Sequence, residues 1–191
     1  MRDGSPGDVR SLDDVRALSA LGHPDRARLM DALAVHGPST TSALAATLGR
    51  ATGSVSHHLK VLAEAGLVAP APEAAADRRE RRWKLVSRGM RWSPREFRDE
   101  PAGEAAATAA QAVLLARDLE RARQFLATAE EPWDEASSST HVWVRATPDE
   151  LAELVRQLDE LLLSWRRREV PDDGRERRVV RAFAMAFPSE P

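Results

Sequence analysis

The spacing of apolar residues in the first half of the chain predicts four short helices. Apolar positions recur there every three or four residues, as on one face of a helix, and each stretch ends at a glycine. Ser11 can cap the first helix, Pro24 suits the first turn of the second, and Thr40 or Thr41 can cap the third. The predicted helices are 11–21, 24–36, 42–49 and 52–65.

A different pattern follows the fourth helix. Residues 67–72 (LVAPAP) and 81–86 (RRWKLV) are short enough for strands, and they flank the charged stretch 73–80. Two prolines, Pro70 and Pro72, restrict the first segment to an edge strand, because proline cannot donate to a neighbouring strand. We therefore predict two strands joined by a basic loop.

The second half begins with a long helix and continues with an alternating pattern. Apolar residues recur at helical spacing over about 104–131, in a wide stripe. Thr147, Pro148 and Glu150 then form the pattern of a capping box before a second amphipathic helix. Residues 141–146 and 179–187 are plausible strands, the latter with alternating side chains, so we predict a β-α-β module at the end of the chain.

These elements predict a mainly α fold with a small β component. We expect a winged helix-turn-helix domain, then a long dimerisation helix and the β-α-β module. The predicted boundaries are a frayed N-terminus at 1–10, the first domain at 11–88, a linker at 89–103 and a C-terminal domain at 104–191.

Composition excludes several classes of function. The chain has no cysteine, which removes disulfides, thiolate metal sites and cysteine nucleophiles. It has no apolar run long enough for a membrane span and no apolar segment near its start that could be a secretory signal, so we expect a cytoplasmic protein. We also find no nucleophile–base pair, phosphate-binding glycine loop or metal cluster, so we expect no enzymatic activity and no cofactor.

Charge is distributed unevenly along the chain. Residues 1–95 hold 15 Lys and Arg against 10 Asp and Glu, although the net charge of the whole chain is −2. Within 50–95 the numbers are 10 and 4. A basic region on an otherwise acidic protein indicates a local site for a polyanion.

The stretch 40–66 has the spacing of a helix-turn-helix, with the tight turn at Gly49. In such a motif one helix braces a second helix, which lies in the DNA major groove. Within the second helix, the adjacent residues His57 and His58 must point to different faces, so they cannot close on one metal ion. We predict that His58 packs at the edge of the apolar face and that His57 points outward with Ser54 and Lys60.

The same motifs resemble a known family. ALGHPDRARLMDAL, LAATLG and SVSHHLKVLAEAGLV occur in the order and spacing of the ArsR-like winged helix-turn-helix repressors of bacteria, over roughly residues 12–86. The resemblance implies a homodimer that binds a palindromic operator, usually to repress. The tail, about residues 87–191, is similar to that of uncharacterised actinobacterial regulators, and this similarity names no ligand.

The chain also departs from that family. Ala51-Thr52 stands where members often have Ser-Gln, which weakens the helix cap and leaves the base preference open. The cysteine metal sites of the founding members are impossible here, and the helix 104–131 lacks the histidines of their other metal site. We therefore expect no metal site.

Position and resemblance together give the candidate DNA-binding residues: Thr41, Thr52, Gly53, Ser54, Ser56, His57, Lys60, Arg78, Arg79, Arg81 and Arg82. The plain alternative for the helix residues is a solvated surface. For the four arginines, which lie in or beside the tip of the wing, the alternative is an ordinary charged loop like 172–178. The wing as a whole is placed at 76–82.

Candidates for dimerisation lie along the stripe of the long helix, at Leu115, Leu119, Ala122 and Leu126. Burial of this stripe within one chain is the alternative, and the two-fold symmetry of operators favours the dimer. Trp143 and Trp165 are candidates for a non-metal ligand pocket, although large aromatic residues more often fill a core.

The sequence thus predicts a sequence-specific DNA-binding transcriptional regulator, a dimeric repressor that reads a palindrome with helix 52–65 and a basic wing. A small-molecule effector stays open. The rival hypothesis is a winged-helix module that binds another protein and not DNA.

Overall fold

The computed structural model describes residues 10–72, 81–87 and 89–190. Contacts divide the chain into two compact units, 1–122 and 123–191, and each is described by itself. The division falls late in the long helix, whereas the sequence predicts a linker at 89–103. That predicted linker contains β5 (Met90–Arg91) and a short 3-10 helix, η2 (Pro94–Phe97), whose Phe97 is buried.

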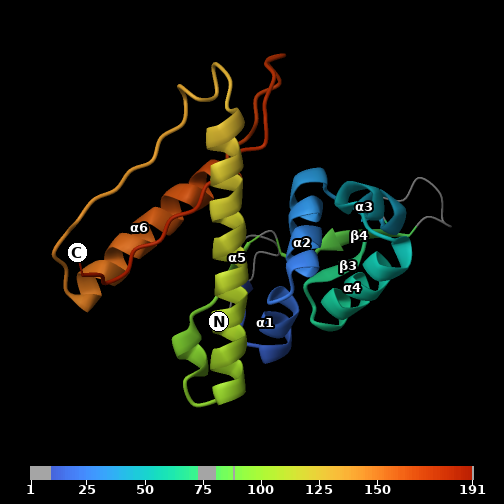
Figure 1. Ribbon diagram of the computed structural model, residues 1–191, viewed down its shortest axis with the longest axis horizontal. Coiled ribbons are helices and arrows are strands. Elements are labelled where there is room, and N and C mark those ends of the chain that lie inside the picture. Colours follow the sequence, from blue (N-terminus) through green and yellow to red (C-terminus); the bar gives the residue numbers. More distant parts are fainter. Residues whose placement is uncertain (1–9, 73–80, 88, 191) are drawn as a thin grey trace. The chain divides into compact units, whose positions relative to one another are not determined.

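Four helices build the first part of unit 1 (Figure 1). They are α1 (Val15–Leu21), α2 (Pro24–His36), α3 (Thr41–Leu48) and α4 (Thr52–Glu64). The predicted periodicity is therefore confirmed for all four. The first helix begins later than expected, because Asp14 rather than Ser11 accepts the capping hydrogen bond, from the backbone N–H of Arg16. For α3 the cap is Thr40, which accepts from the N–H of Ala43 at 3.1 Å.

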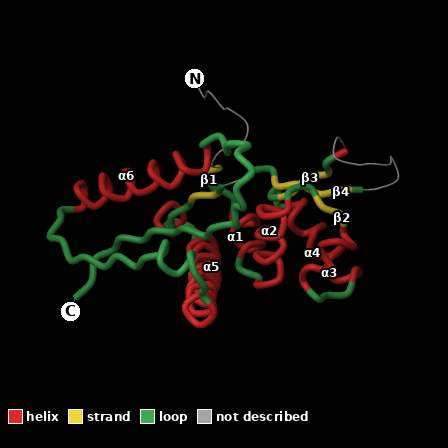
Figure 2. The backbone as a smooth tube through the Cα atoms, turned by 90° about the horizontal axis from the view of Figure 1, so that it is seen from above, coloured by secondary structure: helices red, strands yellow, loops and turns green. Residues whose placement is uncertain are grey.

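Three short strands lie together beside these helices (Figure 2). They are β2 (Ser39–Thr40), β3 (Val68–Pro70) and β4 (Arg82–Leu85), in the antiparallel order β2-β4-β3. Pro70 lies in an edge strand, as the sequence predicts. A second pair, β1 (Arg10–Ser11) with β5, is parallel and was not predicted.

A leucine-rich core joins α1 to α4 with the long helix α5 (Pro101–Thr128). Leu18, Leu29, Leu44 and Leu59 are almost completely buried in it. The first turns of α5 join this core through Ala107 and Ala110, which are fully buried. Close packing also explains Gly103, since a Cβ there would lie 2.9 Å from Cδ1 of Phe97. The start of α5 is therefore an integral part of unit 1.

Unit 2 contains the end of α5 and α6 (Pro148–Arg167). The capping box predicted for α6 is present: Thr147 accepts from the N–H of Glu150, and Glu150 accepts from the N–H of Thr147. The β-α-β prediction is wrong in its strands, because residues 141–146 and 179–187 are extended but form no strand in the described structure. Alternation shows which side chains share a face, but a strand also needs a hydrogen-bonded neighbour.

Candidate nucleic-acid interface

Helices α3 and α4 meet at a tight turn whose geometry depends on one glycine. Gly49 adopts the left-handed conformation, with φ at 63°, and its N–H donates to the end of α3. A residue with a Cβ is strained in this region, so glycine suits the turn. Leu48 of α3 and Val55 and Leu62 of α4 are buried where the helices pack. The pair is therefore fixed by its apolar faces, and the opposite face of α4 stays free.

That opposite face carries the polar residues that the sequence singles out. All six are exposed: Thr52, Gly53, Ser54, Ser56, His57 and Lys60. Small side chains occupy the first turn, so another molecule can approach the helix backbone closely. Lys60 lies one turn further on, 3.9 Å from Glu64, and both side chains are largely in solvent. The face offers hydrogen-bond donors at its start and a positive charge behind them.

The N-terminus of α4 adds backbone donors to this face. Ala51 occupies the cap position, and no side chain caps the helix there. The first N–H groups of a helix attract anions when no side chain accepts from them. The weak cap noted in the sequence therefore leaves these groups available to a phosphate. Thr41, the remaining candidate outside α4 and the wing, begins α3 and is half-buried.

The wing is described only in part. Arg81 is exposed, and its guanidinium lies 4.6 Å from the ring centre of Trp83. Arg82 is half-buried in β4, opposite Thr40 of β2. Arg78 and Arg79 lie outside the described residues. The described part of the basic wing thus lies at the start of β4, which pairs with β2, the strand directly before α3.

Comparison with known families agrees with this geometry. Residues 21–71 match a family model described as a helix-turn-helix domain. This part of the chain is therefore similar to known helix-turn-helix domains. The match covers α2, β2, α3, α4 and β3, and it leaves α5 and α6 outside.

Other comparisons add little. No curated protein matches the chain. Among solved structures, the apo form of a ZitR mutant from Lactococcus lactis is 21% identical, with 76% of this chain and 83% of that chain covered. Its TM-score is 0.32, so this likeness carries no argument. The assignment of the helix-turn-helix domain therefore rests on the family match and the observed elements.

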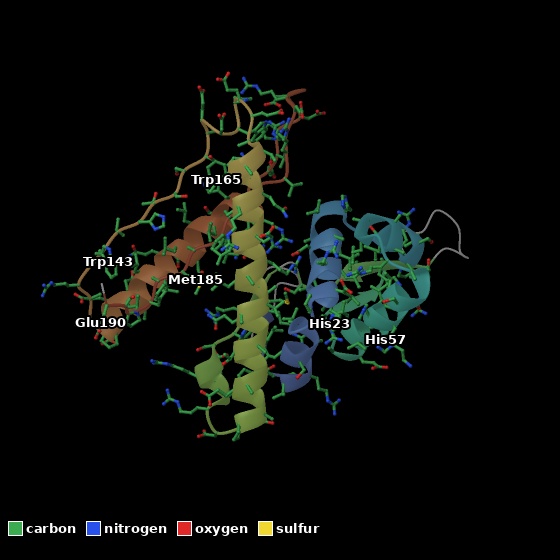
Figure 3. The ribbon with its side chains drawn as sticks, viewed as in Figure 1. His23, His57, Trp143, Trp165, Met185 and Glu190 are labelled. Atoms are coloured by element: carbon green, nitrogen blue, oxygen red, sulfur yellow. The ribbon has the colours of Figure 1, made fainter. Side chains whose placement is uncertain are left out.

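A pair of histidines connects α4 to the start of α2. His23 lies at the junction of α1 and α2, and its Nδ1 accepts from the N–H of Asp25 at 3.1 Å, so it caps α2 (Figure 3). Its ring centre is 4.7 Å from that of His58 on α4. Nδ1 of His58 is buried and has no hydrogen-bond partner among the described residues. His58 therefore packs, as the sequence predicts, while His57 on the same helix is exposed.

His23, Asp25 and His58 place potential metal-ligating atoms within 4.8 Å of one another. Two of the three already have partners. Nδ1 of His23 is occupied by the cap of α2, and Oδ1 of Asp25 lies 3.2 Å from a guanidinium nitrogen of Arg50. A metal on Nε2 of His23 would require a proton on Nδ1, which would then face the N–H of Asp25. The cluster is therefore better suited to fixing α4 against α2.

The buried position of His58 gives a pH prediction. Burial lowers the pKa of His58, as do His23, Arg26 and His57, while Asp25 acts in the opposite direction. The unfolded chain therefore binds this proton more readily, so stability is complete above an ordinary histidine pKa of about 6.5 and falls below it. We expect the free energy of unfolding to fall between about pH 7 and pH 5, and His58→Gln to reduce that fall. Denaturant titrations at several pH values measure it.

His36→Gln provides the matched control, because His36 is exposed at the end of α2. This variant should keep the full pH dependence. An unchanged slope in His58→Gln would show that the buried ring does not govern stability in this range.

An ionic cluster that the sequence did not reveal joins α2 to α5. Asp31 of α2 accepts hydrogen bonds from both Arg117 and Arg121, and Arg121 also lies 3.3 Å from Asp118. Asp118 is the buried charged residue of the cluster, with 6% of its surface exposed. Burial lowers the pKa of Arg117, and Asp31 opposes that shift. The i, i+4 spacing of the two arginines was visible, but their partner lies 86 residues away from Arg117.

The dimerisation candidates become more exposed along α5. Leu115 is half-buried, Ala122 is exposed, and Leu119 and Leu126 expose 42% and 76% of their surfaces. The ligand candidates are exposed as well: Trp143 shows 74% and Trp165 62%. Trp165 stacks with Arg168, whose guanidinium lies 4.6 Å from the ring centre. The described structure encloses neither tryptophan in a pocket.

Among the described residues, no helix combines the length and the apolar character needed to cross a bilayer.

Proposed function

We propose that the chain is a DNA-binding transcriptional regulator that inserts the exposed face of α4 into the major groove. One observation carries this proposal: within a helix-turn-helix domain, the polar residues of α4 from Thr52 to Lys60 are exposed while its apolar residues are buried. A helix with a free N-terminus and a nearby cation can contact phosphates and base edges together. The partly described wing, 76–82, would add contacts to phosphates or to an adjacent minor groove.

The proposed regulator acts as a homodimer on a palindromic operator, most simply as a repressor. Two copies of α4 would enter major grooves about 34 Å apart, one turn of the double helix. Leu115, Leu119, Ala122 and Leu126 are the proposed dimer contacts, supported by the exposed leucines late in α5. We propose that the chain has no enzymatic activity. Trp143 and Trp165 stay the candidate residues for binding a small-molecule effector.

A gel-shift titration of the full chain with DNA from upstream of its own gene tests the proposal. Saturable binding that survives excess random DNA supports it. No binding at low salt would favour the rival hypothesis, a winged helix that contacts another protein.

Lys60→Ala tests the phosphate contact. We expect weaker binding to operator and random DNA alike, and a slope of log affinity against log salt that is lower by about one unit. Fluorescence anisotropy between about 50 and 200 mM salt measures that slope. Arg145→Ala removes the same charge from an exposed site in unit 2 and should change neither value.

His57→Ala and Ser54→Ala test base reading. Each should cost about 1–3 kcal/mol on the operator and relax the preference for one base position, since a base-edge contact is lost. Competition with operators substituted one position at a time measures the preference. Equal losses on operator and random DNA would rule out base reading by these residues.

A further inference from the structure

Helix α6 has an apolar face that no part of the described chain buries. The face consists of Leu151, Leu154, Val155, Leu158, Leu161, Leu162 and Trp165. At about 100° per residue, all of them fall within about 60° of Leu158. Yet α6 contains no buried residue, and Leu161 and Trp165 expose 56% and 62% of their surfaces.

The rest of the described chain covers this face only in part, since Leu151, Leu154, Leu158 and Leu162 are half-buried while Val155, Leu161 and Trp165 are exposed. Figure 3 labels Trp143 in the segment before α6 and Met185 in the segment after it. Both are exposed, at 74% and 46%, and neither segment forms a strand. A unit that leaves so many large apolar side chains in water gains little from its own core. A second surface packed against α6 would therefore bury apolar area that the described chain leaves in water.

The pattern of the face is compatible with a second copy of α6. Counted from Leu158, the other six positions of the face lie three, four and seven residues away in both directions, so the face reads the same forwards and backwards. An antiparallel pair of identical helices around a two-fold axis can use this arrangement, because each apolar position then meets an apolar position on the other side of the centre. The face spans about 21 Å at 1.5 Å per residue, which is too long for a small ligand to cover.

Charge selects the antiparallel direction. The first turn of α6 carries Asp149 and Glu150, and its last turn carries Arg166 and Arg167. An antiparallel partner places its basic end beside the acidic end of the first copy, and this occurs twice in a two-fold pair. A parallel partner would instead place like charges together at both ends.

We propose that α6 is an interface for a second copy of this chain, in which two α6 helices pack antiparallel with Leu158 at the two-fold axis. Leu151 of one copy then lies opposite Trp165 of the other. This interface is additional to the contacts proposed on α5, and it does not depend on DNA binding.

Cross-linking tests the proposal in the full chain, which has no cysteine of its own. Leu158→Cys should be joined to its copy by a short bis-maleimide reagent. Leu151→Cys and Trp165→Cys should each cross-link poorly alone and efficiently when mixed. Glu160→Cys, on the opposite side of α6, is the matched control and should stay uncross-linked.

Several results would overturn the proposal. One is that Leu158→Cys cross-links no better than Glu160→Cys. Another is that Leu151→Cys alone cross-links as efficiently as the mixture, which would mean that the helices are parallel. A wild-type chain that sediments as a monomer at tens of micromolar would also overturn the proposal, and this measurement needs no variant. Gel shifts on the same samples separate this result from the proposed function, since operator binding without α6 cross-links would contradict only the α6 interface.

Discussion

Leu59→Ala should reduce the free energy of unfolding by about 2–5 kcal/mol, the range for leucine-to-alanine changes in well-packed cores. Leu59 is fully buried in α4, among leucines contributed by the other helices of the helix-turn-helix domain. The lost methyl groups would leave a cavity where α4 is held in place. Urea unfolding, followed by tryptophan fluorescence, measures the change.

The adjacent residue provides the control for this prediction. Lys60→Ala changes an exposed side chain one position away and should alter stability by less than about 0.5 kcal/mol. Leu59→Met keeps most of the volume and should cost less than about 1.5 kcal/mol. Similar stabilities for Leu59→Ala and Lys60→Ala would mean that α4 is not anchored through its apolar face. At low temperature, where both variants are folded, Lys60→Ala should lower the DNA affinity more than Leu59→Ala does, since only Lys60 belongs to the proposed contact surface.

The periodicity of the sequence predicts α2, α3 and α4 because each of them buries one continuous apolar face. It identifies α2, α3 and α4 with their glycine ends, and it places α6 from its capping box. It also predicts which side of α4 is exposed, since Val55, Leu59 and Leu62 are buried. These features depend on residues close together in the chain, so local patterns are sufficient for them.

Features that join distant residues were not predicted. The pairing of β1 with β5 involves two residues in each strand, too few for a pattern. The contact between His23 and His58 depends on how α4 packs against the start of α2. In unit 2, the alternation in 179–187 predicts a strand that the described structure does not form, because nothing in the sequence specifies a neighbouring strand. The proposed pairing of α6 differs from these features, because there a pattern within one helix is used to propose a contact with a second molecule.

The second large effect is expected at the ionic cluster between α2 and α5. Asp31→Ala would leave Arg117 without its carboxylate, and the Nη1 atom of Arg117 is already buried without a partner. The side chains of Arg117 and Asp31 are 15% and 30% exposed. Removing one partner of a fully buried pair costs about 3–5 kcal/mol. Because water still reaches Asp31, we expect a smaller loss of about 2–3 kcal/mol in the free energy of unfolding.

A double-mutant cycle separates the cost of a stranded charge from the loss of ordinary packing. Arg117→Met keeps an unbranched, though shorter, side chain and removes the charge, so Asp31→Ala combined with Arg117→Met should cost less than the two single changes added together. Asp159→Ala, at an exposed site on α6, should cost little and serves as the control. Additive single changes would mean that Asp31 and Arg117 act independently. Coupling would establish that this pair holds α5 to α2. The exposed part of the proposed dimer contacts, from Leu119 onward, begins directly after this attachment.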